Sequence, residues 1–262
     1  MLRRIAIFLA LFAIGCGSEP ASISVAPPPP PVLIHLPGIG GELSIDHHLV
    51  NGLRDGGVSK SIEIIDWTES DRGPRALGNV ARHKEWAQRV AERIEAIYHA
   101  DPRTPIILVG HSGGTGIAVW ALEDLPPQVH VRTLLLLASA LSPRYDLTAA
   151  LRHVSGHAFS LYSDRDDAIL GTGTSVFGTV DRVKGPAAGY IGFHTPPHGQ
   201  TKEYDKLIQL PYDPAWARFG NPGDHIGPTD RRFASAVLAP LINRDAPIVS
   251  AAAPVSDPAI SR

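Results

Sequence analysis

The sequence has 262 residues, a formal net charge of −2 at pH 7 and a hydrophobic content of 44%. A chain of this length can bury one sizeable core and is too short for two comfortable domains. The near-neutral charge excludes the strongly basic composition of many nucleic-acid-binding proteins, so we expect no nucleic-acid partner. Cys16 is the single cysteine, which excludes an internal disulfide.

The first 16 residues are typical of a signal peptide. Two arginines precede an apolar run, residues 5–15, that is too short to span a bilayer as a stable helix. The run ends in Ala13-Ile14-Gly15-Cys16, which resembles a bacterial lipobox, although lipoboxes usually have leucine where Ala13 stands. The resemblance implies a lipid on Cys16, so we expect an exported lipoprotein anchored to a membrane of the bacterial cell envelope. The alternative is an ordinary signal peptide with an incidental cysteine.

Segments of biased composition flank the central part of the chain. Residues 17–31, which include the run Pro27–Pro31, predict an extended proline-rich spacer. Residues 246–262 are rich in alanine, proline and serine, and we expect them to form a disordered tail. The residues between these flanks, 32–245, are expected to form a single α/β domain.

Short apolar runs alternate with amphipathic stretches through this domain. Continuous apolar runs are expected of buried parallel strands, and the stretch 80–98 carries its apolar residues on one helical face. Their alternation predicts an α/β fold with a mostly parallel central sheet and helices on both faces. Residues 171–199 show no periodicity, so we expect a functional loop or lid there. In chain order, the expected elements are strands at 32–36 and 61–67, a helix at 80–98, a strand at 105–109, a helix at 115–125, a strand at 131–138, a helix at 146–154, strands at 158–162 and 206–210, and a helix at 229–242.

The segment Gly110-His111-Ser112-Gly113-Gly114 fits the pattern G-x-S-x-G. It lies between an expected strand and an expected helix, where glycines on both sides of the serine allow a sharp turn that exposes the hydroxyl. It resembles the nucleophile elbow of the α/β-hydrolase superfamily, especially of its lipases and esterases, and the resemblance covers about residues 32–243. The resemblance implies that Ser112 is a catalytic nucleophile that forms an acyl-enzyme.

A second glycine-rich segment, His35-Leu36-Pro37-Gly38-Ile39-Gly40-Gly41, follows the first expected strand. It is similar to the His-Gly-x-Gly-Gly loop of the same family, with Pro37 where that loop has its histidine. Backbone N–H groups in such a loop stabilise the alkoxide that develops during acyl transfer. The similarity implies an oxyanion hole formed by Ile39 and Gly113, and a register shifted by one residue would make Gly40 the donor.

The family order of serine, acid and histidine places the acid after a late strand. The segment Ser163-Asp164-Arg165-Asp166-Asp167 follows the expected strand at 158–162 and offers three aspartates. The family spacing favours Asp166, with Asp167 next and Asp164, which could instead pair with Arg165, third. Because adjacent carboxylates repel each other, at least one of them is expected to face solvent.

The family places its histidine on a loop after the last strand, and Gly223-Asp224-His225-Ile226-Gly227 has this position. His225 is therefore expected to be the general base, with its tautomer fixed by the acid. His194 and His198 also follow the acid, but no strand precedes them, so we expect them to line a lid or pocket. His111 is expected to pack or to line the pocket.

Together these residues predict a serine esterase that acts on a small-molecule or lipid ester and needs no cofactor. No metal site is expected, because His47, His48 and the other histidines lack convincing ligand spacing. Two alternatives remain: an acyltransferase or amidase on the same fold, and a non-catalytic binding lipoprotein. We expect the substrate pocket to come from residues 66–75 and 171–199, whose sequence does not identify the substrate.

Overall fold

The computed structural model describes residues 27–69, 71–73, 76, 79–194 and 201–244. The expected signal peptide with Cys16, the first part of the spacer, the expected tail and His198 lie outside the described residues. Within the described part of the chain, no helix combines the length and the apolar character needed to cross a membrane.

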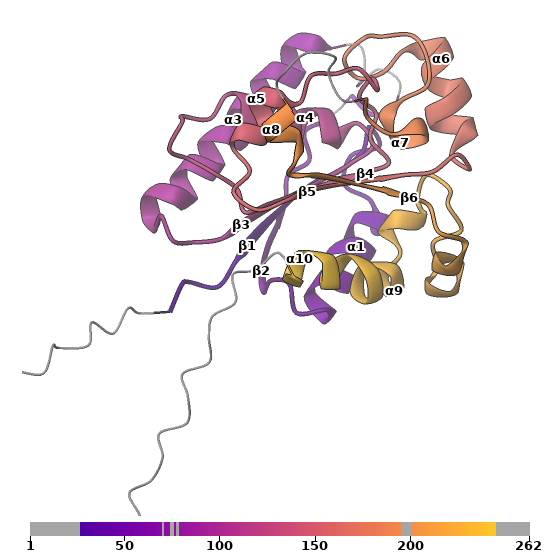
Figure 1. Cartoon of the computed structure of the whole chain (residues 1–262). Coiled ribbons are helices and arrows are strands. Elements are labelled where there is room, and N and C mark those ends of the chain that lie inside the picture. The colour runs from indigo at the N-terminus through magenta and orange to yellow at the C-terminus, as the bar shows by residue number, and fades with distance from the viewer. Residues whose placement is uncertain (1–26, 70, 74–75, 77–78, 195–200, 245–262) are drawn as a thin grey trace, which may run out of the picture.

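Six strands form the central sheet: β1 (Val32–Leu36), β2 (Ser61–Ile64), β3 (Ile106–His111), β4 (Thr133–Leu137), β5 (Ala158–Tyr162) and β6 (Leu207–Pro211). Their order is β2-β1-β3-β4-β5-β6, and every neighbouring pair is parallel (Figure 1). The register aligns their carboxyl ends, because Leu36 pairs with Gly110 and Gly110 pairs with Leu136. The turns that follow the strands therefore meet at one edge of the sheet.

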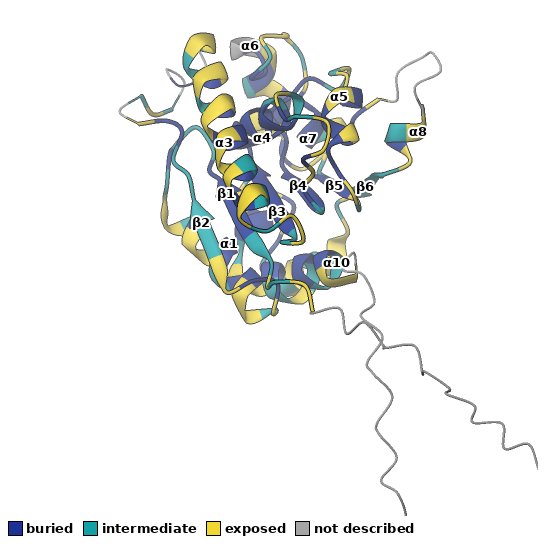
Figure 2. Cartoon of the chain, turned by 90° about the vertical axis from the view of Figure 1, so that its left-hand side faces the viewer, coloured by how far each residue is buried: buried dark blue, intermediate teal, exposed yellow. Residues whose placement is uncertain are grey.

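Helices pack on both faces of this sheet: α1 (Ser44–Asp55), α3 (Val80–Ala100), α4 (Gly114–Glu123), α5 (Thr148–Arg152), α6 (Thr174–Phe177), α7 (Ala188–Ile191), α8 (Thr201–Tyr204), α9 (Arg231–Phe233) and α10 (Ala239–Arg244). One face is covered by α3, α4 and α5, and the other by α1, α9 and α10. Successive strand residues alternate between the two faces, as Leu33 and Ile34 do. Figure 2 shows the central strands β3 and β4 buried between these layers, the edge strands β2 and β6 partly buried, and the outer side of α3 exposed. The predicted fold class is confirmed.

Helix α1 was not predicted from the sequence. It contains Gly52, which lowers helix propensity. The structure explains this glycine, because a Cβ at position 52 would lie 2.3 Å from the carbonyl oxygen of Arg231 in α9. The close packing of α1 and α9 therefore requires a glycine at position 52, and this glycine makes α1 harder to predict from the sequence.

The closing helix, expected at 229–242, runs from Arg231 to Arg244 with a π-helical turn, Ala234–Leu238, between α9 and α10. Pro240 lies just after this turn. Proline has no backbone N–H to donate to the carbonyl four residues earlier, and its ring crowds that carbonyl. A local widening of the helix relieves this conflict.

The segment expected to be irregular, 171–199, contains regular structure at its start. A π-helical turn, Asp167–Gly173, leads directly into α6, and α7 follows after a loop. The prediction of a structureless loop is therefore wrong for this part of the segment. The 3-10 helices Pro214–Phe219 and Gly227–Thr229 complete the described elements.

Candidate active site

Ser112 lies in the turn between β3 and α4. Its φ of +51° is in the left-handed region, which residues other than glycine rarely adopt. The turn brings backbones so close that two of its glycines have no room for a side chain. A Cβ at Gly110 would lie 2.7 Å from the Cα of Thr115, and a Cβ at Gly114 would lie 2.2 Å from the carbonyl oxygen of Leu36. The serine is thus held in a strained turn at the carboxyl edge of the sheet.

Two other side chains form a hydrogen-bonded array with Ser112. The Nε2 atom of His225 lies 2.9 Å from the Oγ of Ser112, and its Nδ1 atom lies 2.6 Å from Oδ2 of Asp166. Ser112 and Asp166 are 5% and 4% exposed, so little water competes for these bonds. The structure therefore brings together the three residues predicted as nucleophile, base and acid, from turns that follow β3, β6 and β5.

Asp166 is the aspartate of the three candidates that contacts the imidazole of His225. Asp164 and Asp167 are exposed, in line with the expected repulsion between adjacent carboxylates. Among the described residues, Asp164 forms no ion pair with Arg165, whose guanidinium lies over the ring of Tyr212 at 4.8 Å from its centroid. Asp166 is thus the buried one of the three aspartates, and this difference in burial cannot be seen from their order in the sequence.

The rival histidine that the structure describes lies apart from this array. His194 is exposed, and its backbone N–H donates to the carbonyl of Pro143 at 2.7 Å. His198, the second rival, is outside the described residues.

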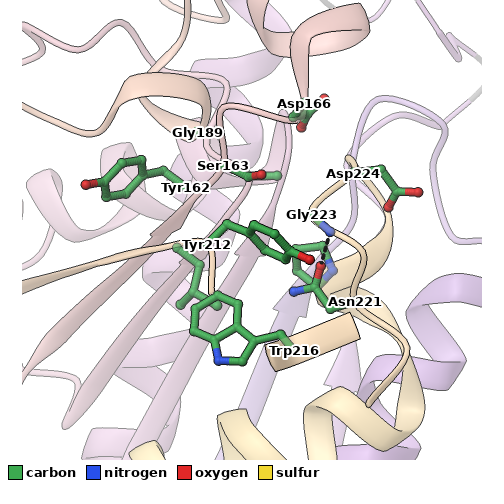
Figure 3. Close-up of a pocket in the computed structure, with 12 residues that line it drawn as sticks. Tyr162, Ser163, Asp166, Gly189, Tyr212, Trp216, Asn221, Gly223 and Asp224 are labelled. Atoms are coloured by element: carbon green, nitrogen blue, oxygen red, sulfur yellow. Dashed lines mark hydrogen bonds between the residues drawn. The ribbon is translucent and has the colours of Figure 1, made fainter. Parts of the chain in front are cut away.

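The loop that carries His225 is held by buried polar contacts. Asn221 is 2% exposed, and its Oδ1 accepts a hydrogen bond from the backbone N–H of Gly223 at 2.9 Å. This pair, Asp166 and Tyr212 line the same small hollow, which has a volume of about 10 Å³. Figure 3 shows the residues around it. Sequence analysis did not single out Asn221, although Asn221-Pro222-Gly223 is typical of a turn and its hydrogen bond spans only two residues.

His111, next to the serine, supports the same loop from the sheet side. Its Nε2–H donates to the backbone carbonyl of His225 at 3.0 Å, while its Nδ1 is buried without a hydrogen-bond partner among the described residues. Burial and the neighbouring His225 lower the pKa of His111 to about 3. His111 is therefore neutral at ordinary pH, and its one proton is available for the bond to the carbonyl. This contact gives His111 a positioning role that the expected packing did not include.

The predicted oxyanion residues lie side by side next to the serine. A Cβ at Gly113 would lie 2.7 Å from Cγ2 of Ile39, and a Cβ at Gly38 would lie 3.2 Å from the Cβ of Ser112. In the described part of the chain, no turn, loop or cap hydrogen bond is donated by the backbone N–H of Ile39 or of Gly113. Both N–H groups are therefore free to bind an oxygen of a substrate.

Trp67 fixes the glycine loop to the elbow. This side chain is fully buried, donates its Nε1–H to the carbonyl of Pro37 at 2.7 Å and packs against Gly113. Gly40, the alternative donor, has its side-chain position against Leu43 rather than against the serine. The expected pocket segment that begins at residue 66 thus supports the oxyanion loop.

An apolar cavity of about 220 Å³ opens beside Ser112. Its far wall comes from the segment after Asp166 and from α6, so residues 171–199 contribute to it as predicted. The described residues of 66–75 do not line it, which corrects that part of the prediction. Sequence analysis also did not predict that Ala140, in the turn after β4, lines the cavity. The lining residues are Ile39, Ser112, Ala140, Ala168, Ile169, Leu170, Gly173, Thr174, Gly178 and Val180.

Histidine and carboxylate side chains elsewhere form pairs. His35 and Asp46 make a buried pair at 2.7 Å, and His47 makes an exposed pair with Glu42 at 3.1 Å. Within the described ranges, no group of three or more histidine, cysteine or acidic residues is arranged to hold a metal ion.

A serine with positive φ after β3, an acid after β5 and a histidine after β6 meet at the carboxyl edge of a parallel sheet. The fold is of the α/β-hydrolase type. No family model and no curated protein matches the sequence. Several solved structures are similar to the chain at low identity.

One of these structures is a proposed hydrolase of the alpha/beta superfamily from Xanthomonas campestris pv. campestris (19% identity, TM-score 0.45, 80% of this chain and 99% of that chain). Another is Est1E from Butyrivibrio proteoclasticus (13% identity, TM-score 0.41, 84% and 89%). A third is a cutinase-like protein from Cryptococcus sp. (12% identity, TM-score 0.41, 83% and 95%).

Proposed function

We propose that the chain is a serine hydrolase that cleaves carboxylic esters through an acyl-enzyme on Ser112. One observation carries this proposal: a continuous array of hydrogen bonds runs from the carboxylate of Asp166 through the imidazole of His225 to the hydroxyl of Ser112. A serine hydroxyl is a weak nucleophile until an adjacent base accepts its proton. The array supplies that base, and the acid fixes the imidazole with Nε2 facing the hydroxyl.

The reaction follows from this geometry. The Oγ of Ser112 attacks the ester carbonyl while its proton passes to Nε2 of His225, and Asp166 stabilises the imidazolium that forms. The carbonyl oxygen becomes an alkoxide and accepts hydrogen bonds from the backbone N–H groups of Ile39 and Gly113. The C–O bond to the alcohol then breaks as His225 returns the proton to the leaving oxygen. Water repeats the same steps on the acyl-enzyme and releases the acid.

Ester hydrolysis by a matched pair of serine variants tests the proposal. Ser112→Ala removes the nucleophile, and we expect the rate to fall by roughly 10⁴-fold or more with the melting temperature nearly unchanged. Ser155→Ala is the control, because Ser155 is exposed and lies before β5, at the opposite edge of the sheet. Equal activity in Ser112→Ala and the wild type would refute the proposal.

We also propose, from the sequence, that Cys16 carries a lipid that anchors the domain to a membrane. The described residues 27–31 lead into the first residue of β1, whereas the site lies at the other end of the strands. An anchor at Cys16 would thus hold the domain by the edge opposite to Ser112. Incorporation of a radiolabelled fatty acid into the expressed full chain, and its loss in Cys16→Ser, tests this; labelling that persists in Cys16→Ser would contradict it.

A further inference from the structure

We propose that the cavity beside Ser112 is an acyl pocket for unbranched chains of about six to nine carbons, and that Val180 sets its length. This inference rests on the proposed function, because it assigns the acyl part of the ester to a place in the same site. It is carried by the position of the cavity, its apolar lining, its volume and the contacts of Val180.

The position of the cavity identifies it with the acyl side of the ester. Its lining begins at Ser112 and Ile39, which are the nucleophile and an expected oxyanion donor. His225 is not among the described residues that line it. The leaving alcohol must lie within hydrogen-bond reach of Nε2 of His225 in order to receive its proton. The group that enters the cavity is therefore the acyl group.

The lining makes the cavity suited to a hydrocarbon chain. Its side chains are those of alanine, isoleucine, leucine and valine, with Thr174 as the polar exception apart from the nucleophile. The hydroxyl of Thr174 already donates to the carbonyl of Leu170 at 2.6 Å, so no free polar side chain of the wall demands a polar ligand. Ile169, at the rim, is 48% exposed and extends the apolar surface outward.

The volume of the cavity limits the length of the chain. An apolar protein cavity of about 150 Å³ holds a benzene molecule, which corresponds to roughly 25 Å³ for each carbon. A cavity of about 220 Å³ therefore holds a chain of middle length and is too small for the long chains of membrane lipids. Each methylene that enters such a pocket is expected to raise kcat/KM about fourfold until the cavity is full.

Val180 lines both this cavity and a second one of about 660 Å³ between α3 and α4. The side chain is 1% exposed and packs on the backbone of α4, where a Cβ at Gly116 would lie 2.7 Å from its Cγ1 atom. Its backbone N–H donates to the carbonyl of Ala140 at 3.0 Å. The next residue, Asp181, accepts two hydrogen bonds from Ser142, at 2.8 and 2.6 Å. Val180 is thus a fixed partition, and a smaller residue there would join the two cavities.

A series of p-nitrophenyl esters with acyl chains of 2 to 16 carbons, used below their micellar concentrations, tests this inference on the purified protein. We expect kcat/KM of the wild type to peak between six and nine carbons. Val180→Ala should move the peak to longer chains, and Val180→Phe should move it to shorter ones. Val183→Ala is the matched control, because Val183 is 48% exposed and does not line the cavity, so the peak should stay in place.

Melting temperatures of the variants show whether each one folds. If Val180→Phe does not fold, Val180→Ala alone decides the test. A wild-type peak at fewer than six carbons or at more than nine would overturn the inference while leaving the proposed esterase intact. An unchanged peak in folded Val180→Ala would overturn the role of Val180. Failure to hydrolyse every ester of the series would overturn the proposed function together with the pocket.

Discussion

At the scale of single residues, the imidazole of His225 is held between one acid and one hydroxyl. Asp166 accepts from Nδ1, so the protonated nitrogen faces the acid and the basic nitrogen faces Ser112. Asp166→Asn keeps the size of the side chain but presents an amide that can reverse this tautomer. We expect kcat to fall by about 10⁴-fold, measured by ester hydrolysis under saturating substrate.

Asp164→Asn is the control for this prediction, since Asp164 is exposed and two residues away. Its activity should stay within about twofold of the wild type. If Asp164→Asn lost activity and Asp166→Asn kept it, the assignment of the acid would be wrong.

The sequence could narrow the acid to three neighbouring aspartates but could not select one from the residues alone. The direction of the backbone after β5 decides which of these aspartates faces the imidazole. That direction depends on the π-helical turn that begins at Asp167. The family spacing nevertheless favoured Asp166, and the structure places that residue against the imidazole. The contact of His111 with the carbonyl of His225 was not predicted, because the G-x-S-x-G pattern leaves the residue before the serine open and so gives that residue no partner.

At the scale of elements, the site is assembled from turns at one edge of the sheet. The strand β5 was predicted at its observed bounds, and β3 extends two residues further than predicted to reach His111. These strands are continuous apolar runs buried on both faces, a pattern that sequence analysis detects well. Helix α1 and the turn at 167–173 were not predicted, and Gly52 and Gly171 lower the helix propensity of these two segments. Sequence analysis therefore predicted the catalytic array and the later part of the apolar wall, and it missed the wall residues Ala140 and 168–170.

At the scale of the whole molecule, buried ionisable groups give the stability a dependence on pH. Burial raises the pKa of Glu123 to about 7, and the carboxylates of Asp124 and Asp146 add to this, although a hydrogen bond from Tyr145 offsets part of it. The folded protein therefore holds this proton up to a higher pH than the unfolded chain. The stabilisation is complete below the unfolded pKa near 4.5 and is lost as the pH rises through about 7.

Glu123→Gln removes this loss and keeps an oxygen that can accept from Tyr145. We expect the variant to melt at a higher temperature than the wild type at pH 8, with the difference disappearing near pH 5. The lowered pKa of His111 has the opposite effect, because it removes stability as the pH falls below about 6.5. This effect is the same in the wild type and in Glu123→Gln. Thermal melts at the two pH values measure the difference, and an equal shift at both would contradict the assignment to Glu123.

Covalent capture shows whether the hydroxyl of Ser112 is an activated nucleophile. A fluorophosphonate reacts when a serine oxygen displaces fluoride from phosphorus, which requires the same base and oxyanion donors as ester attack. Mass spectrometry of the digested protein should find one phosphonyl adduct, on the peptide that contains Ser112, and none in His225→Ala. A folded wild-type protein without an adduct on Ser112, or with its adduct on another serine, would contradict the account.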